Sequence, residues 1–194
     1  RLFINIHILD LLKTGAALLQ AIAFLKPALA EGKLILLVGL TKQSAEPIKQ
    51  TAEALGLPYV TERWLGGTMT NFKTINARVK YLEDLEKKQA ADNFAGYTKK
   101  EKLLKEREIV TMRKKFDGLR KLTRVPDIVV ISSLKESQLP VREAKLMKVK
   151  VVGIVNTDSD PKQIDYPIPA NDNSRKAVEM ILGAIKNELV KREV

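Results

Sequence analysis

Residues 34–39 read Leu-Ile-Leu-Leu-Val-Gly, a run of five large apolar side chains that ends in a glycine. A continuous apolar run of this length, without polar alternation, favours a β-strand that is covered on both faces. Strands of that kind belong to parallel sheets, in which helices pack on either side. Residues 34–39 therefore point to an α/β fold.

Strand-like and helix-like segments alternate on both sides of this run. Short β-favouring segments predict strands at residues 3–8, 34–39, 59–61, 128–131, 151–155 and 165–168. Amphipathic segments predict helices at residues 11–30, 44–55, 136–148 and 171–192, with Pro27 near the end of the first and Pro140 in the first turn of the third. Repeated β-α units predict a parallel sheet with helices on both faces.

The middle of the chain breaks this alternation. Apolar residues recur at helical spacing in two sets, Ile75, Val79, Leu82 and Leu85, then Ile109, Met112, Phe116 and Leu119. Thr98 and Glu101 between them form a capping-box pattern, which marks the start of the second helix. We expect an antiparallel helical hairpin with arms of roughly 30 Å. The predicted organisation is an α/β core of residues 1–72 and 123–194, with residues 73–122 as an inserted helical hairpin.

Positive charge is the strongest feature of the composition. The chain of 194 residues has 34 Lys and Arg against 23 Asp and Glu, a net charge of +11. Residues 73–122 hold 15 of the basic and 8 of the acidic residues, so much of the excess lies in the hairpin. An excess of this size favours a polyanionic partner, nucleic acid first and an acidic membrane surface second.

Other classes of protein have little support in the composition. The sequence has no cysteine, which excludes disulfides and thiolate metal sites. The longest apolar run, residues 34–40, is too short to span a bilayer, and no secretory leader is visible.

The loop after the third predicted strand, residues 63–72, reads Arg-Trp-Leu-Gly-Gly-Thr-Met-Thr-Asn-Phe. Arg63 can pair with a phosphate, and Trp64 offers either a stacking face for a base or a hydrophobic anchor. Gly66 and Gly67 would let the backbone approach a bulky partner closely. The alternative is a Trp64 that packs in the core ahead of an ordinary Gly-Gly turn.

These ten residues resemble a signature of the bacterial small-subunit ribosomal protein S2 family. The resemblance continues in the same order at residues 6–11, 97–101, 152–161 and 165–172, so it runs from end to end of the chain. It implies a flavodoxin-like α/β core with a protruding coiled-coil hairpin. Glu62 stands where relatives often have a histidine, so a contact made there does not transfer to this chain.

Resemblance to this family also implies a function. The expected role is a structural component of the small ribosomal subunit that binds its rRNA and neighbouring ribosomal proteins, with ribosomal protein S1 as a further partner. No cofactor, metal, membrane or small-molecule substrate is implied, and the protein is not expected to be an enzyme. The expected location is the cytoplasmic ribosome, with an organellar ribosome as the alternative.

Candidate RNA-binding residues lie in the loop, in the first arm of the hairpin and at two helix starts. They are Arg63, Trp64, Gly66, Gly67, Asn71, Lys73, Arg78, Lys80, Lys42, Arg175 and Lys176. Cations of this kind neutralise phosphates, while glycine and amide groups allow close approach. The alternative for each lysine of the hairpin is a solvated face, since glutamates interleave with them.

Two other functions remain open from the sequence. A phosphate- or nucleotide-binding enzyme could use Lys42, Asp158 and Asp160 near the carboxyl ends of strands. However, no phosphate-loop or dinucleotide fingerprint is present, and residues 156–161 also suit a tight turn. His7 is the only histidine and is expected to be structural, while Asp172 is expected to cap the last helix. The other alternative is a coiled-coil adaptor that binds a protein through the hairpin.

Overall fold

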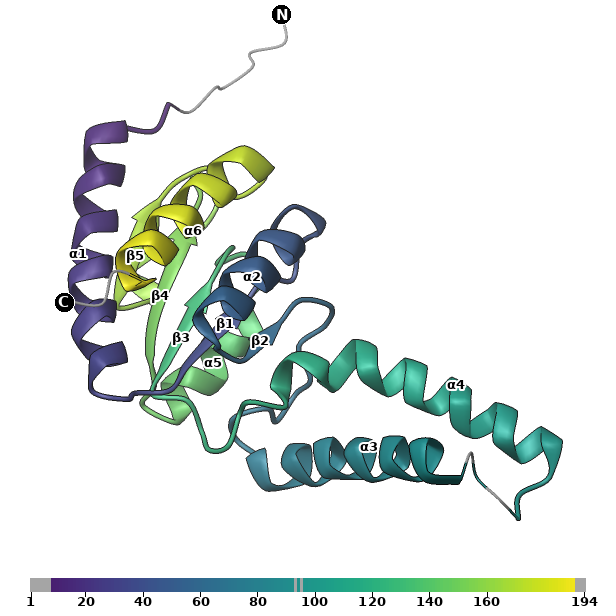
Figure 1. Cartoon of the computed structure of the whole chain (residues 1–194). Coiled ribbons are helices and arrows are strands. Elements are labelled where there is room, and N and C mark those ends of the chain that lie inside the picture. The colour runs from purple at the N-terminus through teal and green to yellow at the C-terminus, as the bar shows by residue number, and fades with distance from the viewer. Residues whose placement is uncertain (1–7, 93, 95, 191–194) are drawn as a thin grey trace, which may run out of the picture.

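The computed structural model describes residues 8–92, 94 and 96–190. These residues form a mixed α/β body with a five-stranded, all-parallel sheet. The strands are β1 (Ile35–Val38), β2 (Tyr59–Val60), β3 (Ile128–Ile131), β4 (Lys150–Val155) and β5 (Tyr166–Pro169). Their order across the sheet is β2-β1-β3-β4-β5, with β1 in register beside both β2 and β3 (Figure 1).

Helices cover both faces of this sheet. The α-helices are α1 (Leu11–Ala30), α2 (Lys42–Leu55), α3 (Phe72–Asp92), α4 (Lys99–Phe116), α5 (Gln138–Leu146) and α6 (Arg175–Val190), with short 3-10 helices η1 (Asp117–Leu119) and η2 (Pro161–Gln163). Leu37 of β1 packs in one apolar layer with α1, α2 and α6, and Leu36 packs in the opposite layer with α5. All four residues of β1 are buried, so the prediction from residues 34–39 is confirmed.

Helices α3 and α4 extend away from the sheet, side by side and in opposite directions (Figure 1). We call residues 72–116 the arm. Its two helices bury apolar residues against each other and against the body, among them Val79, Leu82, Leu85, Ile109 and Phe116. At its base Glu86 of α3 forms ion pairs with Arg113 of α4 and with Arg120, whose Nη1 lies 2.7 Å from Oε2. The predicted capping box at Thr98 and Glu101 is present at the start of α4.

Most predicted elements match within a few residues, and two parts differ. The predicted strand at residues 3–8 falls mainly outside the described residues, as does His7, and Ile8 belongs to no strand. The last helix begins at Arg175 rather than at residue 171. Asp172 turns inward and accepts hydrogen bonds from Ser133 Oγ (2.6 Å) and Asn156 Nδ2 (2.8 Å). The prediction that Asp172 caps this helix is therefore wrong, because the side chain joins the ends of β3 and β4 instead.

Among residues 8–92, 94 and 96–190, no helix combines enough length with enough apolar character to cross a membrane.

Candidate nucleic-acid interface

The loop between β2 and α3 folds around one buried carboxylate, that of Glu143 in α5. Oε1 of Glu143 accepts hydrogen bonds from Trp64 Nε1 (2.9 Å) and from the backbone N–H of Gly67 (2.8 Å). Oε2 accepts from the backbone N–H groups of Met69 (3.0 Å) and Thr70 (3.2 Å), and from Thr70 Oγ1 (3.2 Å). Four residues of the loop thus donate five hydrogen bonds to a single side chain.

These hydrogen bonds also decide the charge state of Glu143, which is only 4% exposed. Burial by itself raises the pKa of the carboxyl, but the donors of the loop, Trp64 first, outweigh burial and hold the pKa below its ordinary value. Glu143 is therefore an anion at neutral pH. Its charge is stabilised by N–H and O–H dipoles that point at both oxygens.

Trp64 is a packing residue in this structure. Its side chain is 5% exposed and lies in the apolar layer that also holds Met69 and Val141. An indole in that position cannot stack on a base at the surface, because its faces contact the core and its N–H is bound to Glu143. Burial favours the core-packing alternative for Trp64 over a direct contact with RNA.

Other members of the loop face outward. Arg63, Gly66 and Asn71 are exposed, and Asn71 Oδ1 accepts a hydrogen bond from Thr74 Oγ1 (2.8 Å) at the start of α3. The two glycines differ. Gly67 has a φ of +90°, and a Cβ there would lie 3.1 Å from Asn71 Cβ, so the turn itself requires glycine. Around Gly66 the nearest atom to a Cβ would be Leu139 Cδ2 at 4.0 Å, so the fold leaves this position open.

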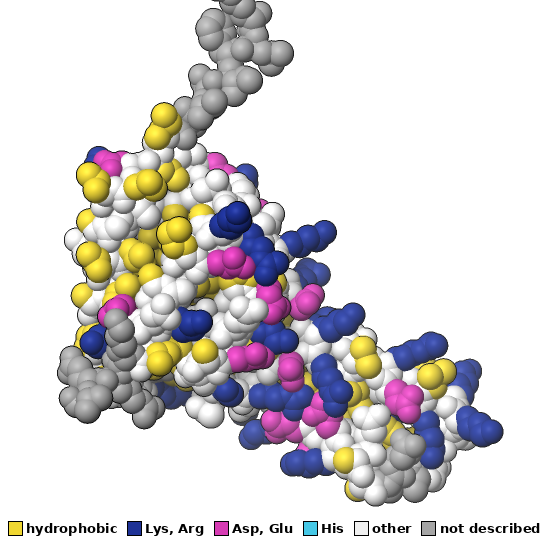
Figure 2. Space-filling model, turned by 45° about the horizontal axis from the view of Figure 1, so that its top comes forward, with side chains coloured by type: hydrophobic (Ala, Val, Ile, Leu, Met, Phe, Trp, Pro, Cys, Tyr) yellow, Lys and Arg dark blue, Asp and Glu magenta, His cyan; other side chains and the backbone are white. Residues whose placement is uncertain are grey.

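The predicted cations are exposed, but they do not share one face. Lys73 and Lys80 are seven residues apart on α3 and lie on the same side of the helix, whereas Arg78 is about 200° around the axis from Lys80. Figure 2 shows Lys and Arg side chains along the arm, while hydrophobic side chains gather on the part of the body far from it. We call Arg63 of the loop, together with Lys73 and Lys80 on the outer side of α3, the basic strip; Arg78 does not belong to it.

A second group of predicted cations lies at the carboxyl edge of the sheet. Lys42 is the first residue of α2, and Arg175 and Lys176 are the first two of α6, two helices that pack against each other. Arg175 is held by Glu179, with Nε 2.7 Å from Oε1, so part of its charge is already compensated. Lys42 and Lys176 are exposed. They form a smaller basic area, separate in sequence from the loop and the arm.

The two carboxylates considered for an enzyme site, Asp158 and Asp160, both have partners within the fold. Asp158 forms an ion pair with Lys135, with Nζ 2.9 Å from Oδ2, and Asp160 accepts a hydrogen bond from the N–H of Lys162 (3.0 Å) at the start of η2. Among the residues that the structure describes, no group of three acidic, histidine or cysteine side chains could hold a metal ion. The tight-turn interpretation of residues 156–161 accounts for these contacts.

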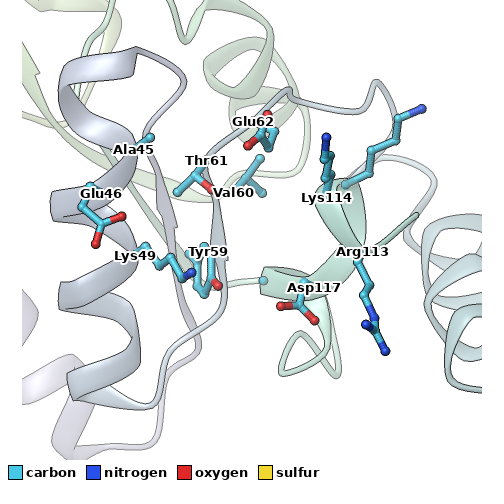
Figure 3. Close-up of a pocket in the computed structure, with 12 residues that line it drawn as sticks. Ala45, Glu46, Lys49, Tyr59, Val60, Thr61, Glu62, Arg113, Lys114 and Asp117 are labelled. Carbon is cyan, nitrogen blue, oxygen red and sulfur yellow. The ribbon is translucent and has the colours of Figure 1, made fainter. Parts of the chain in front are cut away.

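One polar cavity of about 250 Å³ lies between α2, β2 and the end of α4 (Figure 3). Its lining carries both signs of charge, including Lys49, Lys114, Glu46, Glu62 and Asp117. The guanidinium of Arg113 points away from the cavity toward Glu86 of α3. Carboxylates in the lining make this cavity a poor site for a phosphate.

Two structural features of this region were not predicted from the sequence. Glu143 was missed, although a carboxylate among the buried residues Pro140, Val141 and Ala144 of one helix is a recognisable signal. The outward side of α4 was also missed. There Leu103, Leu104 and Val110 are each about half exposed, between Lys100, Arg107 and Lys114, which recur every seven residues.

Comparisons with known proteins agree with these observations. The chain is 41% identical over 186 residues to "Small ribosomal subunit protein uS2" of Rhodopirellula baltica. The aligned residues cover 96% of this chain and 72% of that protein. It is 38% identical over 193 residues to the protein of that name from Mycoplasmopsis synoviae, covering 100% of this chain and 65% of the relative. "Small ribosomal subunit protein uS2c" of Rhodomonas salina is 39% identical over 185 residues, with coverage of 95% and 76%.

A model of one protein family, described as "Ribosomal protein S2", matches residues 3–191. The match includes the loop at residues 63–72, the arm and all five strands. With that span, and with relatives of about 40% identity over nearly its whole length, the chain belongs to the ribosomal protein S2 family.

Proposed function

We propose that this protein is a structural component of the small ribosomal subunit, where it binds rRNA and neighbouring ribosomal proteins. The observation that carries the proposal is the family match over residues 3–191. The net charge of +11 and the exposed basic strip on the loop and α3 supply the physical means of binding RNA. The proposal includes no cofactor and no chemical step.

Binding in this proposal is electrostatic and depends on shape. Arg63, Lys73 and Lys80 neutralise phosphates, and Gly66 lets the backbone approach the RNA without a side chain between them. Asn71 offers its amide to the RNA beside the start of α3. Lys42 and Lys176 contact phosphates from the carboxyl edge of the sheet. The α/β body fills a space between RNA helices, on the solvent side near the head–body junction, in a bacterial cytoplasmic ribosome or an organellar one.

The division of the chain follows the same proposal. Residues 1–72 and 123–194 form a flavodoxin-like core that rests on the RNA, and residues 73–122 form an inserted coiled-coil hairpin. The strand order β2-β1-β3-β4-β5 is the one that flavodoxin-like sheets have.

Protein partners are proposed for the outward side of α4. Exposed leucine and valine side chains contribute little to binding phosphates, but they suit an apolar contact with a protein. Leu103, Leu104 and Val110 are flanked by cations on the same side of the helix, so the matching partner surface is apolar and acidic. We propose ribosomal protein S1 as the protein that docks there.

The role of the basic strip is tested by removing its charge. A triple variant, Arg63→Ala, Lys73→Ala and Lys80→Ala, should weaken binding to small-subunit rRNA by at least about a hundredfold at 100 mM salt. The matched control removes the same charge from exposed lysines on α1, α5 and η2, in Lys13→Ala, Lys145→Ala and Lys162→Ala. Equal losses in both triple variants would mean that net charge alone, and not this strip, binds the RNA.

A further inference from the structure

We propose that Glu143 is a positioning residue, whose carboxylate sets the conformation in which the loop presents Arg63, Gly66 and Asn71 to RNA. This inference rests on the proposed RNA-binding role of the loop. In this inference, the conformation of the loop depends on a side chain of α5, which is far from the loop in the sequence.

The geometry divides the loop between the two oxygens of one planar group. Oε1 holds the first half through Trp64 and Gly67, and Oε2 holds the second half through Met69 and Thr70. Because a carboxylate is rigid and both oxygens are used, the two halves are fixed relative to each other as well as to α5.

Little else holds the loop in this shape. No helix or strand covers residues 61–71. Within the loop, Thr68 donates to the carbonyl of Leu65 from both its N–H (3.0 Å) and its Oγ1 (2.6 Å), and the N–H of Asn71 donates to the carbonyl of Gly67 (2.8 Å). Trp64 and Met69 anchor it in the core, but apolar packing alone does not fix where the backbone N–H groups point.

Loss of the carboxylate would leave three inward N–H groups without an acceptor. The N–H groups of Gly67, Met69 and Thr70 converge on Glu143, as they would on an anion in a backbone nest. Buried donors without an acceptor are costly, so the loop would open to let water reach them. Opening moves Gly66 and Asn71, which are next to these residues in the chain, away from their present positions.

The direct test is Glu143→Gln, which keeps the side-chain size but replaces one acceptor oxygen by a donor group. The remaining oxygen can serve only one half of the loop, so we expect hydrogen exchange to become at least about tenfold faster at Gly67, or at Met69 and Thr70, whichever faces the new NH2 group. We also expect red-shifted emission of Trp64, the only tryptophan, and an rRNA dissociation constant at least about tenfold higher. Exchange at Val129 and Val130 in β3 should not change. The matched control is Glu101→Gln, which removes another hydrogen-bonded carboxylate, at the exposed capping box of α4, and should change none of these readings.

A merely structural role is separated by a double-mutant cycle with Arg63→Ala. If Glu143 acts by positioning the loop, its replacement should cost less affinity in the Arg63→Ala background than in the native protein, because the contact it positions is already gone. Equal cost in both backgrounds, or wild-type affinity after the loop amides are released, would overturn the inference. If Glu143→Gln does not fold, Trp64→Phe takes its place, because it removes the indole N–H that donates to Oε1 of Glu143. The double-mutant cycle with Arg63→Ala is then made with Trp64→Phe.

Failure of the proposed function gives a different result. If Arg63→Ala alone leaves the affinity for rRNA unchanged, the RNA contact assigned to the loop is wrong. If Arg63→Ala weakens binding while Glu143→Gln does not, the contact between Arg63 and RNA is supported and only the positioning role of Glu143 is wrong.

Discussion

Trp64 and Glu143 are 79 residues apart in the sequence, yet the indole N–H of Trp64 donates to Oε1 of Glu143 across 2.9 Å in the buried layer between the loop and α5. The most conspicuous aromatic residue of the chain therefore does not face a partner. Its hydrogen bond holds the loop that we propose binds RNA. Substitutions on the buried side of the loop should therefore change the stability of the protein, whereas substitutions on its exposed side should change the affinity for rRNA.

The first prediction concerns stability. Trp64→Phe keeps an aromatic ring but removes the indole N–H, so it should lower the free energy of unfolding by about 2 kcal/mol. Urea denaturation followed by far-UV circular dichroism measures this loss. Tyr97→Phe, which removes an exposed polar group, serves as the control and should cost less than about 0.5 kcal/mol. An unchanged midpoint for Trp64→Phe would argue against the hydrogen bond to Glu143.

The two glycines of the loop should respond differently to alanine. Gly67→Ala forces a side chain into a left-handed conformation beside Asn71 and should destabilise the protein by about 1–2 kcal/mol. Gly66→Ala should change stability by less than about 0.5 kcal/mol and still weaken binding to rRNA, because the added methyl group lies where we propose that the RNA approaches. Thermal unfolding and rRNA titration of both variants check the pair. A Gly66→Ala variant with native affinity would show that the RNA does not approach there.

At the base of the arm, stability should depend on acid pH through Glu86. A hydrogen bond from Arg120, partly opposed by burial and supported by Arg113, lowers the pKa of Glu86 to about 2 from 4.5. A carboxyl with a lowered folded-state pKa stabilises the fold fully above its unfolded pKa, and that contribution is lost as pH falls toward the folded pKa. The stability difference between the native protein and Glu86→Gln should therefore be constant from pH 7 to 5 and shrink between about pH 4.5 and 2. A difference that stays constant down to pH 3 would contradict the ion pairs with Arg113 and Arg120.

The outward side of α4 gives a prediction about protein binding. Leu104→Ser with Val110→Ser removes exposed apolar surface, so the free energy of unfolding should stay within about 0.5 kcal/mol of the native value. Binding to ribosomal protein S1 should weaken at least about tenfold, measured by titration with the purified proteins. Ala77→Ser with Asn76→Ser on α3 is the control and should leave that binding unchanged. If both variants bind S1 equally well, this side of α4 is not its docking surface.

Local patterns were enough to predict the sheet and its helices. The helix at residues 11–30 and the strand at residues 128–131 have the predicted bounds, because the helix has apolar residues at helical spacing, despite Pro27 near its end, and the strand is continuously apolar. The start of α6 was misplaced because Asp172 and Asn171 look like caps in sequence, while in the structure Asp172 joins two strand ends. Side-chain partners that come from distant segments leave no local pattern.

The same limit applies to the candidate site. Arg63 was predicted as an RNA-binding residue from its place in the loop at residues 63–72, and Lys73 and Lys80 from their charge; the structure places all three on the surface. The burial of Trp64 and the role of Glu143 depend on how α5 packs under the loop, which the sequence of the loop does not contain.

The most direct test of RNA binding by the exposed cations is a salt titration of the complex with small-subunit rRNA. If about six phosphates are neutralised, a plot of log Kd against log salt concentration should rise with a slope of about 5, which weakens binding about a thousandfold between 50 and 200 mM. In the triple variant of Arg63, Lys73 and Lys80 the slope should fall by about 3. A flat plot for the native protein would contradict electrostatic docking on RNA.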